Sequence, residues 1–174
     1  QKGEFNIGFV DWNPRPVDES MGIFRPVWLK YSNEVAMKNP VVRSKVDTVR
    51  FDEAWLTVEA TLCNASDRNI SGKLCGKYEE GSFSYPVELA AGETKTVSLT
   101  ADQVRKLHVK NPRLWWCHNL GNPEMYSMEL SFVADGKVSD NQVVDFGIRQ
   151  LDSWFNEDGY RGFILNGKKV LIKG

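Results

Sequence analysis

The chain alternates hydrophobic and polar residues with a period of two along several segments. In residues 54–62, "AWLTVEATL", every second side chain from Ala54 to Leu62 is apolar, and "MYSMELSFV" at 125–133 repeats the pattern. Successive side chains of a β-strand point to opposite faces, so each segment predicts a strand with one buried face. Two such faces bury each other when two sheets pack together. Further strands are expected at Val27–Tyr31, Val41–Asp47, Ile70–Tyr78, Phe83–Leu89, Thr94–Leu99 and Val138–Phe146.

Turn-forming residues separate these segments. Asp135-Gly136 lies between two alternating runs and predicts a β-hairpin, because Asp and Gly tolerate the positive φ angles of a two-residue turn. Asn166-Gly167 predicts a second hairpin by the same chemistry, between Phe163–Leu165 and Val170–Ile172. Further turn signals lie at Asn64–Asn69, Glu80-Gly81, Ala91-Gly92 and Gly121–Pro123.

The pattern as a whole favours an all-β fold. Residues 100–109, "TADQVRKLHV", are an exception and predict a helical turn with Thr100 or Asp102 as its cap. About seven short strands over roughly a hundred residues are typical of an immunoglobulin-like antiparallel β-sandwich. The Cys-Trp-Cys framework of antibody domains is absent, since Met128 stands where a second cysteine would be expected.

The two ends of the chain lie outside the predicted sandwich, which we place at residues 32–150. Residues 1–31 form a turn-rich segment of their own and are expected to be the last strands of a preceding domain. Residues 151–174 follow the last strand of the sandwich and contain the second predicted hairpin. Two incomplete flanks, together with a start at Gln1 rather than Met, favour a portion of a larger protein.

Composition narrows the classes of function. The 174 residues are 41% hydrophobic and carry a formal net charge of −1, with lysines and arginines spread along the chain. The sequence therefore predicts a substantial core and disfavours nucleic acid or an anionic membrane as a partner. No apolar run in the sequence reaches the length of a membrane helix, and its start carries no signal-peptide pattern.

The cysteines and histidines give no sign of a metal or catalytic site. Cys63, Cys75 and Cys117 lack the spacing of metal ligands, and His108 and His118 do not complete a set. We expect buried free thiols, no metal and no cofactor. The histidines also lack a neighbouring nucleophile motif, so neither Ser-His nor Cys-His catalysis is predicted.

Three motifs in a fixed order carry a resemblance to a known family. "DWNPRPVDESMGIFRPVWL" at 11–29 precedes "NPRLWW" at 111–116, and "FGIRQL" at 146–151 leads into "GFILNGKKVLIKG" at 162–174. Together they resemble glycoside hydrolase family 2. The "DWNPRP" loop is most similar to the exo-β-glucosaminidase and β-mannosidase branch of that family. Cys117 departs from the family pattern, which usually has Pro after the paired Trp.

The resemblance implies a jelly-roll domain, similar to a sugar-binding module, before the sandwich and a (β/α)8 catalytic barrel after the hairpin. The whole enzyme would be a retaining hydrolase of β-glycosides such as β-mannosides or β-glucosaminides, with both catalytic glutamates on the barrel. This chain would be non-catalytic and would orient the barrel, with the jelly-roll and barrel as partners and β-linked carbohydrate as substrate. A periplasmic or secreted location follows from the same resemblance. Within the chain, Glu79-Glu80 is not expected to be an acid–base dyad, because adjacent strand residues point to opposite faces.

The same resemblance supplies candidate sugar contacts at residues 10–16. It implies that Asp11 accepts hydrogen bonds from the terminal sugar and that Trp12 offers an apolar face to the pyranose ring. Asn13 and Arg15 are weaker candidates. A carboxylate suits this role because it accepts hydrogen bonds from two neighbouring hydroxyls. Asp11 and Asn13 also fit Asx turns ahead of the prolines, with no part in binding.

Trp115-Trp116 has two interpretations. Exposed aromatic pairs bind sugar rings, so the chain is alternatively a stand-alone carbohydrate-binding or adhesion module. Neighbouring strand residues face opposite ways unless a bulge intervenes, so packing is favoured, with one Trp in the core and the other against a neighbouring domain. Arg25 and Arg149 are expected to bond carbonyls or carboxylates at domain junctions rather than substrate.

Overall fold

The computed structural model describes residue 23 and residues 25–171. These residues form eleven β-strands and one short 3₁₀ helix. No helix in the described part of the chain has the length and apolar character needed to cross a membrane. The elements in chain order are β1 (Val35–Val46), β2 (Glu53–Asn64), β3 (Ile70–Tyr78), β4 (Gly81–Leu89), β5 (Thr94–Leu99), η1 (Arg105–Leu107), β6 (His108–Lys110), β7 (Tyr126–Ala134), β8 (Lys137–Phe146), β9 (Leu151–Phe155), β10 (Arg161–Leu165) and β11 (Lys168–Val170).

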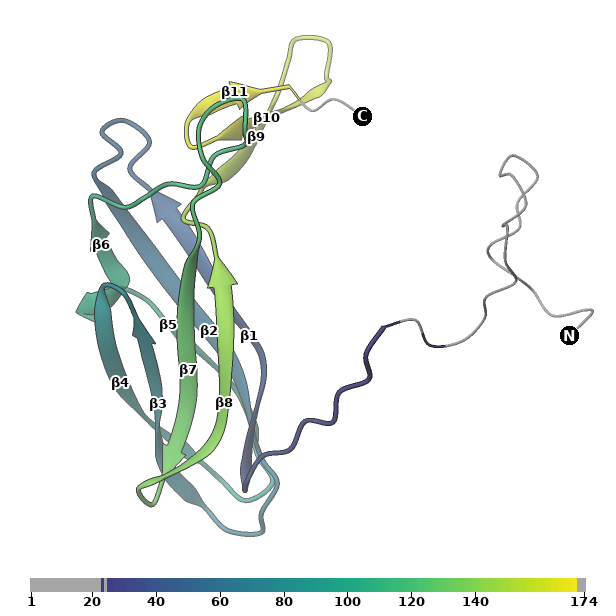
Figure 1. The fold of residues 1–174 in the computed structure, drawn as a ribbon, viewed down its shortest axis with the longest axis vertical. Coiled ribbons are helices and arrows are strands. Elements are labelled where there is room, and N and C mark those ends of the chain that lie inside the picture. The colour runs from purple at the N-terminus through teal and green to yellow at the C-terminus, as the bar shows by residue number, and fades with distance from the viewer. Residues whose placement is uncertain (1–22, 24, 172–174) are drawn as a thin grey trace, which may run out of the picture. The chain divides into compact units, whose positions relative to one another are not determined.

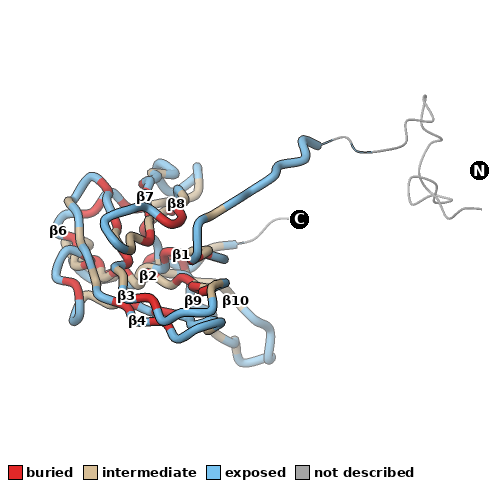
Figure 2. Tube along the Cα trace, turned by 90° about the horizontal axis from the view of Figure 1, so that it is seen from below, coloured by how far each residue is buried: buried red, intermediate tan, exposed pale blue. Residues whose placement is uncertain are grey.

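Eight of the strands form two antiparallel four-stranded sheets. One sheet has the order β1-β2-β5, with β6 paired to another part of β2, and the other has the order β4-β3-β7-β8. The two sheets lie against each other in Figure 1, and buried positions recur along the strands of both in Figure 2. The chain therefore adopts the expected all-β, immunoglobulin-like antiparallel sandwich.

The alternation seen in the sequence builds the core. In β2 every second side chain from Ala54 to Leu62 is at most 1% exposed, as the pattern predicts. These side chains share one core cluster with Leu74 of β3 and Phe132 of β7, which are fully buried. Burial of a leucine or phenylalanine side chain stabilises a fold by about 1.5–3 kcal/mol. Met128 is also fully buried, so a packed thioether occupies the position where a second cysteine would be expected.

Side chains, in place of a backbone ladder, join the two sheets along β1 and β8. The N–H of Val35 donates to Oγ of Ser139 at 2.9 Å, and that hydroxyl donates back to the Val35 carbonyl at 2.9 Å. The N–H of Met37 donates to the buried carboxylate of Asp140 at 2.7 Å, and the Gln142 amide donates to the Met37 carbonyl. An unpaired buried polar group costs about 1–3 kcal/mol, so this seam fixes how the sheets align.

Most predicted strands of the sandwich are confirmed. Ile70–Tyr78 and Thr94–Leu99 are correct at both ends, as β3 and β5. The strand expected at Val41–Asp47 begins earlier, at Val35, and its pairing with β2 shifts register after Lys38. A bulge of this kind interrupts the period of two, so the pattern alone revealed the part of the strand that follows it.

The strand predicted at Val27–Tyr31 is wrong. These residues have no regular secondary structure, and the side chains of Trp28 and Leu29 are 84% and 89% exposed. Aromatic and β-branched residues favour strands, but a strand needs a neighbour to pair with its backbone. Within the described residues, no strand pairs with this segment.

The helical turn expected at residues 100–109 is confirmed in part. A 3₁₀ helix spans Arg105–Leu107, and β6 follows directly after it. The helix is short because the residues of β6 pair with β2 and take an extended backbone. The N-cap residue of this helix is Val104, which makes no side-chain hydrogen bond to it, so the caps expected at Thr100 and Asp102 are wrong. The Thr100 carbonyl instead closes the preceding turn by accepting the Val104 N–H at 2.9 Å.

Both predicted hairpin turns are confirmed. Asp135 and Gly136 have φ angles of 49° and 73° and connect β7 to β8. Asn166 and Gly167 have φ angles of 47° and 77° and connect β10 to β11. The second hairpin belongs to a larger unit than expected, because β9 pairs with β10 and completes a three-stranded sheet of order β11-β10-β9.

The chain divides into two units, Gln1–Lys30 and Tyr31–Gly174. The second unit contains both the sandwich and the sheet of β9–β11. The expected boundary between residues 150 and 151 stays a prediction, as does the assignment of residues 1–31 to a jelly-roll.

Candidate functional site

The predicted sugar-contact loop lies outside the described residues, so its residues stay sequence-based candidates. The described part of the predicted site surrounds Trp115-Trp116. This segment lies where the sandwich meets the sheet of β9–β11, because the amide of Asn166 donates to the Trp115 carbonyl at 3.0 Å. Figure 1 shows that sheet at one end of the sandwich. The candidates outside the described residues are Asp11, Trp12, Asn13 and Arg15.

Trp116 packs at the edge of the sandwich core. Its half-buried ring contacts the core cluster, and Phe51 meets it edge to face at 6.0 Å between ring centres. The ammonium group of Lys168, on β11, lies 4.8 Å from the ring centre. This indole therefore joins the core to the small sheet.

Trp115 is half-buried and has a different set of neighbours. Its backbone N–H donates to the carbonyl of Ile148 at 2.9 Å. The guanidinium carbon of Arg149 lies 4.4 Å from the ring centre, a cation–π contact worth about 0.5–1 kcal/mol at an exposed site. Gly147 approaches so closely that a Cβ added there would stand 2.8 Å from Cβ of Trp115. A side chain at position 147 would displace the indole, so this packing requires glycine.

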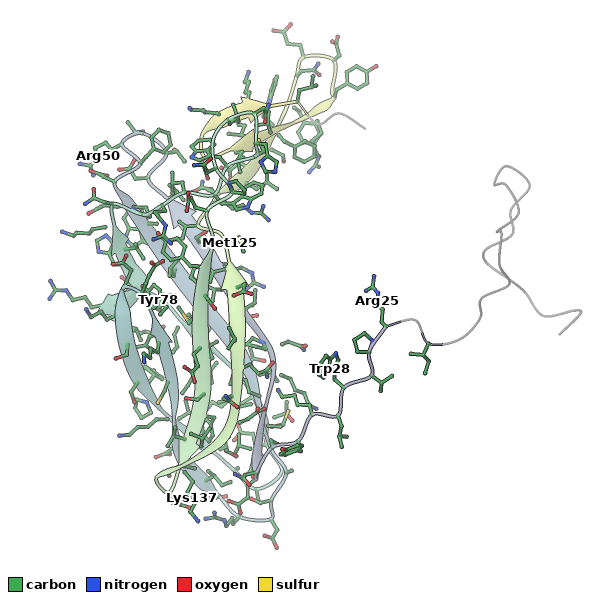
Figure 3. All side chains as sticks on the ribbon, viewed as in Figure 1. Arg25, Trp28, Arg50, Tyr78, Met125 and Lys137 are labelled. Atoms are coloured by element: carbon green, nitrogen blue, oxygen red, sulfur yellow. The ribbon has the colours of Figure 1, made fainter. Side chains whose placement is uncertain are left out.

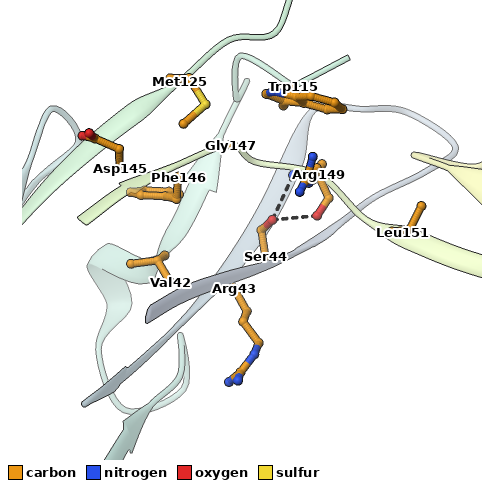
Figure 4. Close-up of a pocket in the computed structure, with 10 residues that line it drawn as sticks. All are labelled: Val42, Arg43, Ser44, Trp115, Met125, Asp145, Phe146, Gly147, Arg149 and Leu151. Carbon is orange, nitrogen blue, oxygen red and sulfur yellow. Dashed lines mark hydrogen bonds between the residues drawn. The ribbon is translucent and has the colours of Figure 1, made fainter. Parts of the chain in front are cut away.

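Arg149 contacts an aromatic ring within this chain, and its expected bond across a domain junction stays a prediction. Its guanidinium stacks on Trp115, and among the described residues no hydrogen bond joins it to a carbonyl or carboxylate. The backbone of Arg149 is held instead by Ser44 of β1, whose hydroxyl donates to its carbonyl at 2.8 Å and accepts its N–H at 2.9 Å (Figure 4). The next residue, Gln150, accepts the Val46 N–H on its side-chain oxygen at 3.0 Å. The segment that leaves β8 is thereby clamped onto β1.

Asn166 ties the small sheet to the sandwich. Its side chain is fully buried, and its Oδ1 accepts the N–H of Gln150 at 2.7 Å. Its own N–H donates to the Gln150 carbonyl at 2.8 Å, and its Nδ2 donates to Trp115. One asparagine at a positive φ therefore satisfies backbone groups of two separate segments.

The residues at this junction line a pocket of about 520 Å³. Figure 4 shows the flat ring of Trp115 above Arg149, with Ser44 bonded to the Arg149 backbone. The other lining residues mix apolar and charged side chains: Val42, Met125, Phe146 and Leu151 on the one hand, Arg43 and Asp145 on the other, with the Gly147 backbone between them.

An ion pair engages the carboxylate of Glu79. The guanidinium of Arg113 donates to its two oxygens at 2.8 and 2.9 Å and also lies 4.6 Å from the ring centre of Tyr126. Burial raises the pKa of the Tyr126 hydroxyl. The hydroxyl oxygen also accepts the backbone N–H of Arg113 at 2.8 Å, which acts in the opposite direction on that pKa. The pair is a half-exposed structural contact. Glu79 and Glu80 both lie in the turn between β3 and β4, so the expectation that they are adjacent strand residues is wrong.

Hydrogen bonds lower the pKa values of two described carboxylates, Asp47 and Glu34. The pKa of Asp47 lies below its usual range because its carboxylate accepts the backbone N–H groups of Val49 and Arg50. Hydrogen bonding to Arg68 lowers the pKa of Glu34. Each of these environments favours the charged carboxylate.

The three cysteines are free but half-buried, which corrects the expectation of buried thiols. Cys63 and Cys75 stand between buried residues on β2 and β3, so they belong to the outward-facing half of each alternating strand. Free cysteine is usually buried. Here the place of each cysteine in the alternating strand decides its exposure instead. The described residues hold no cluster of side chains that could bind a metal ion.

Sequence analysis missed Ser44, Gly147 and the side-chain role of Asn166. "FGIRQL" and the Asn-Gly turn were recognised, but their packing partners lie far away in the sequence. A glycine directly after an apolar strand and before Ile148 was the available signal, since it marks a close approach of another group.

Comparison with known proteins identifies the family. Residues 35–149 match the family model described as "Glycosyl hydrolases family 2". The chain belongs to glycoside hydrolase family 2. The matched residues begin with β1 and end at Arg149, so they contain the whole sandwich and the segment clamped by Ser44.

Several family 2 relatives are exo-glucosaminidases. An exo-beta-D-glucosaminidase of Streptomyces avermitilis is 38% identical over 168 residues, which cover 97% of this chain and 19% of that protein. The exo-beta-D-glucosaminidase of Amycolatopsis orientalis is 32% identical over 98% of this chain and 16% of its own length. A beta-galactosidase of Bacteroides ovatus is 25% identical over 88% of this chain and 17% of its own length. The chain thus spans less than a fifth of these family 2 proteins.

Solved family 2 structures share the fold. A complex of Amycolatopsis orientalis exo-chitosanase CsxA with PNP-beta-D-glucosamine matches 97% of this chain and 19% of that chain, with a TM-score of 0.81 and 32% identity. A family 2 member from Bacteroides cellulosilyticus matches 82% of this chain and 19% of its own, with a TM-score of 0.64 and 26% identity. The predicted branch of the family is therefore confirmed together with the fold.

Proposed function

We propose that this chain is the non-catalytic β-sandwich region of an exo-β-D-glucosaminidase, a retaining enzyme that removes glucosamine from the end of a β-linked chain. The alignment with the Streptomyces exo-beta-D-glucosaminidase, which extends over nearly the whole chain, carries the proposal. The lower identity to the beta-galactosidase supports the choice of glucosaminide over galactoside.

The described carboxylates support a non-catalytic role. A retaining glycosidase needs two carboxyl groups about 5–5.5 Å apart, and its acid holds a proton because its pKa is raised. Arg113 engages Glu79, and hydrogen bonds lower the pKa values of Asp47 and Glu34. The lowered pKa values of Asp47 and Glu34 favour charged carboxylates, which suits structural contacts better than acid catalysis.

The junction supports an orienting role. Asn166 and Ser44 fix the sheet of β9–β11 and the segment before it onto the sandwich. A domain attached after β11 would inherit the direction of this small sheet. Holding catalytic and binding groups in a fixed relative position is itself a contribution to rate, because reorientation then costs no entropy during the reaction.

The loop at residues 10–16 would supply the sugar contacts of the same enzyme. On the family resemblance, Asp11 accepts hydrogen bonds from the terminal sugar and Trp12 covers the ring, with Asn13 and Arg15 nearby. Such contacts discriminate between sugars, because a carboxylate left unpaired by a sugar without the matching hydroxyl is costly.

Hydrolysis of p-nitrophenyl β-D-glucosaminide tests the proposal. We expect the complete protein that contains this chain to release p-nitrophenol, and the isolated 174-residue chain to release none above background. Activity of the isolated chain would contradict the non-catalytic role. A complete protein that hydrolyses the β-D-mannoside or β-D-galactoside in preference would contradict the substrate.

A stand-alone sugar-binding module is the second candidate, because half-exposed Trp115 lines a pocket with both charged and apolar groups. Arg149 and Lys168 already lie over the two indoles, which leaves less of each ring for a sugar. Titration of the isolated chain with glucosamine oligomers, followed by tryptophan fluorescence, separates the two candidates. We expect no saturable change, and a saturable change would favour the module.

A further inference from the structure

A face at the junction end of the sandwich exposes large apolar side chains around a hollow. Met125 and Leu151 are 49% and 63% exposed, and both line the pocket beside Trp115. Figure 3 shows Met125 near the sheet of β9–β11 and Lys137 at the opposite end of the sandwich. Scattered apolar residues are ordinary on a surface, but apolar residues gathered around a concave site are typical of an interaction surface.

The face is organised like the centre of a protein interface. Tryptophan and arginine are the residues that most often carry interface energy, and here Arg149 is already stacked on Trp115. The Ser44 hydroxyl bonds both the N–H and the carbonyl of Arg149. The Arg149 backbone is therefore already ordered, which lowers the entropy cost of binding a partner. Arg43 and Asp145 also line the pocket, so it combines apolar side chains with charged groups that a partner could pair.

The course of the chain favours a domain attached after β11 as the partner. Leu151 lines the pocket and begins β9, and β11 of the same small sheet ends at Val170. A domain attached after β11 would be tethered near the face at a high effective concentration. Relatives such as the Streptomyces protein devote 19% of their length to the region that this chain matches, so proteins of this kind have ample chain for such a domain.

We propose that the face formed by Trp115, Met125, Arg149 and Leu151 is the docking surface for the domain that follows β11 in the complete protein. The inference rests on the proposed function, under which that domain carries the catalytic carboxylates. The clamp of Ser44 and Asn166 sets the direction of the connection, and the docking face supplies a second, independent contact. Two points of attachment restrict a rotation of that domain relative to the sandwich, which a single connection would allow.

Hydroxyl-radical footprinting of the isolated chain and of the complete protein tests the docking. Met125 is a sensitive probe because its thioether oxidises readily. Val143 on β8 is 64% exposed and does not line the pocket, so it serves as the control. We expect the oxidation rate of Met125, relative to Val143, to fall several-fold in the complete protein. An unchanged ratio overturns the proposal.

Met125→Asp supplies an independent test, with Val143→Asp as its matched control. An unpaired carboxylate in an apolar interface is costly, whereas one on a free surface is tolerated. We expect Met125→Asp to lower the unfolding temperature of the complete protein by several degrees and to leave that of the isolated chain nearly unchanged. Val143→Asp should change neither protein. Equal shifts for both variants in the complete protein overturn the proposal.

A second copy of the chain is the other occupant that this face could take. Sedimentation velocity of the isolated chain is expected to show a monomer, and a dimer in which Met125 is protected overturns the proposal. The glucosaminide assay is read separately. Protected Met125 in a protein without that activity supports docking and contradicts the proposed function, and unprotected Met125 in an active enzyme contradicts docking alone.

Discussion

Asn166 illustrates what a single residue reveals in the sequence and what it hides. Local chemistry predicts its positive φ, because asparagine before glycine adopts the hairpin turn readily, and the φ angle is 47°. Its side-chain partners Gln150 and Trp115 are 16 and 51 residues away. Ser44 bonds to Arg149 across 105 residues. No local pattern encodes contacts over such separations, so the turn was predictable and the tie between sheets was not.

Asn166→Ala should loosen the junction. The change removes the acceptor for the Gln150 N–H and the donor to the Trp115 carbonyl, and each group left unpaired costs about 1–3 kcal/mol. We expect a lower free energy of unfolding in urea, followed by tryptophan fluorescence. The variant should also increase the rate of amide hydrogen exchange in β9–β11 more than in β2 or β3, because the small sheet loses its tie to the sandwich while the sandwich stays folded.

Two variants separate the causes of that loss. Asn166→Gly removes the same side chain but keeps a residue that accepts a positive φ, so it isolates the hydrogen bonds from backbone strain. Asn156→Ala removes a comparable bond, to the Tyr160 N–H at 2.7 Å, in an exposed turn. If Asn166→Ala costs no more than Asn156→Ala, the buried amide does not tie the sheets together.

The strands show how far an element is fixed by its own pattern. β3 and β5 were predicted at both ends because their alternation is bounded by clear turns. β9 was missed because the residues "LDSWF" lack regular alternation and form a strand through pairing with β10. β6 is a three-residue strand recruited by β2 at the end of η1. Elements that depend on a neighbour for their structure are thus the ones that the pattern does not reveal.

Tyr78→Phe should test how η1 is attached to β3. The buried Tyr78 hydroxyl donates to the Lys106 carbonyl in η1. Burial, and then the nearby Glu80, raise the pKa of Tyr78 well above the ordinary value of about 10. The folded state therefore keeps a proton that the unfolded chain loses, so the stability from this group is present below about pH 10 and declines as pH rises beyond it.

The measurement is urea unfolding as a function of pH. At neutral pH we expect Tyr78→Phe to lower the free energy of unfolding by about 0.5–1.5 kcal/mol, the usual net value of one hydrogen bond. Above about pH 10 the variant should lose stability less steeply than the original chain, because one titrating group is gone. Tyr160→Phe, at a 73% exposed residue, should leave the slope unchanged. An equally steep decline in Tyr78→Phe would contradict the assignment to this hydroxyl.

For the whole molecule, the order of motifs predicted more than any single motif. "NPRLWW" ends at residue 116 and "FGIRQL" begins at residue 146, yet the two motifs meet at Trp115, Ile148 and Arg149. Because these segments form one junction in the fold, their order along the chain carried more information than either motif alone. On the family resemblance, we predict that substrate recognition depends on a different segment, the loop at residues 10–16.

Asp11→Ala in the complete protein tests that loop. If the carboxylate accepts hydrogen bonds from the terminal sugar, its removal forfeits charge-assisted bonds worth about 1.5–3 kcal/mol, which corresponds to a fall of about 10–100-fold in kcat/KM. The unfolding temperature should change little, because the lost bonds are made to the substrate. Asp67→Ala removes an exposed carboxylate from the turn before β3 and should leave kcat/KM unchanged. Unchanged kcat/KM in Asp11→Ala, or a fall matched by lost stability, would assign Asp11 to an Asx turn that shapes the loop without touching the sugar.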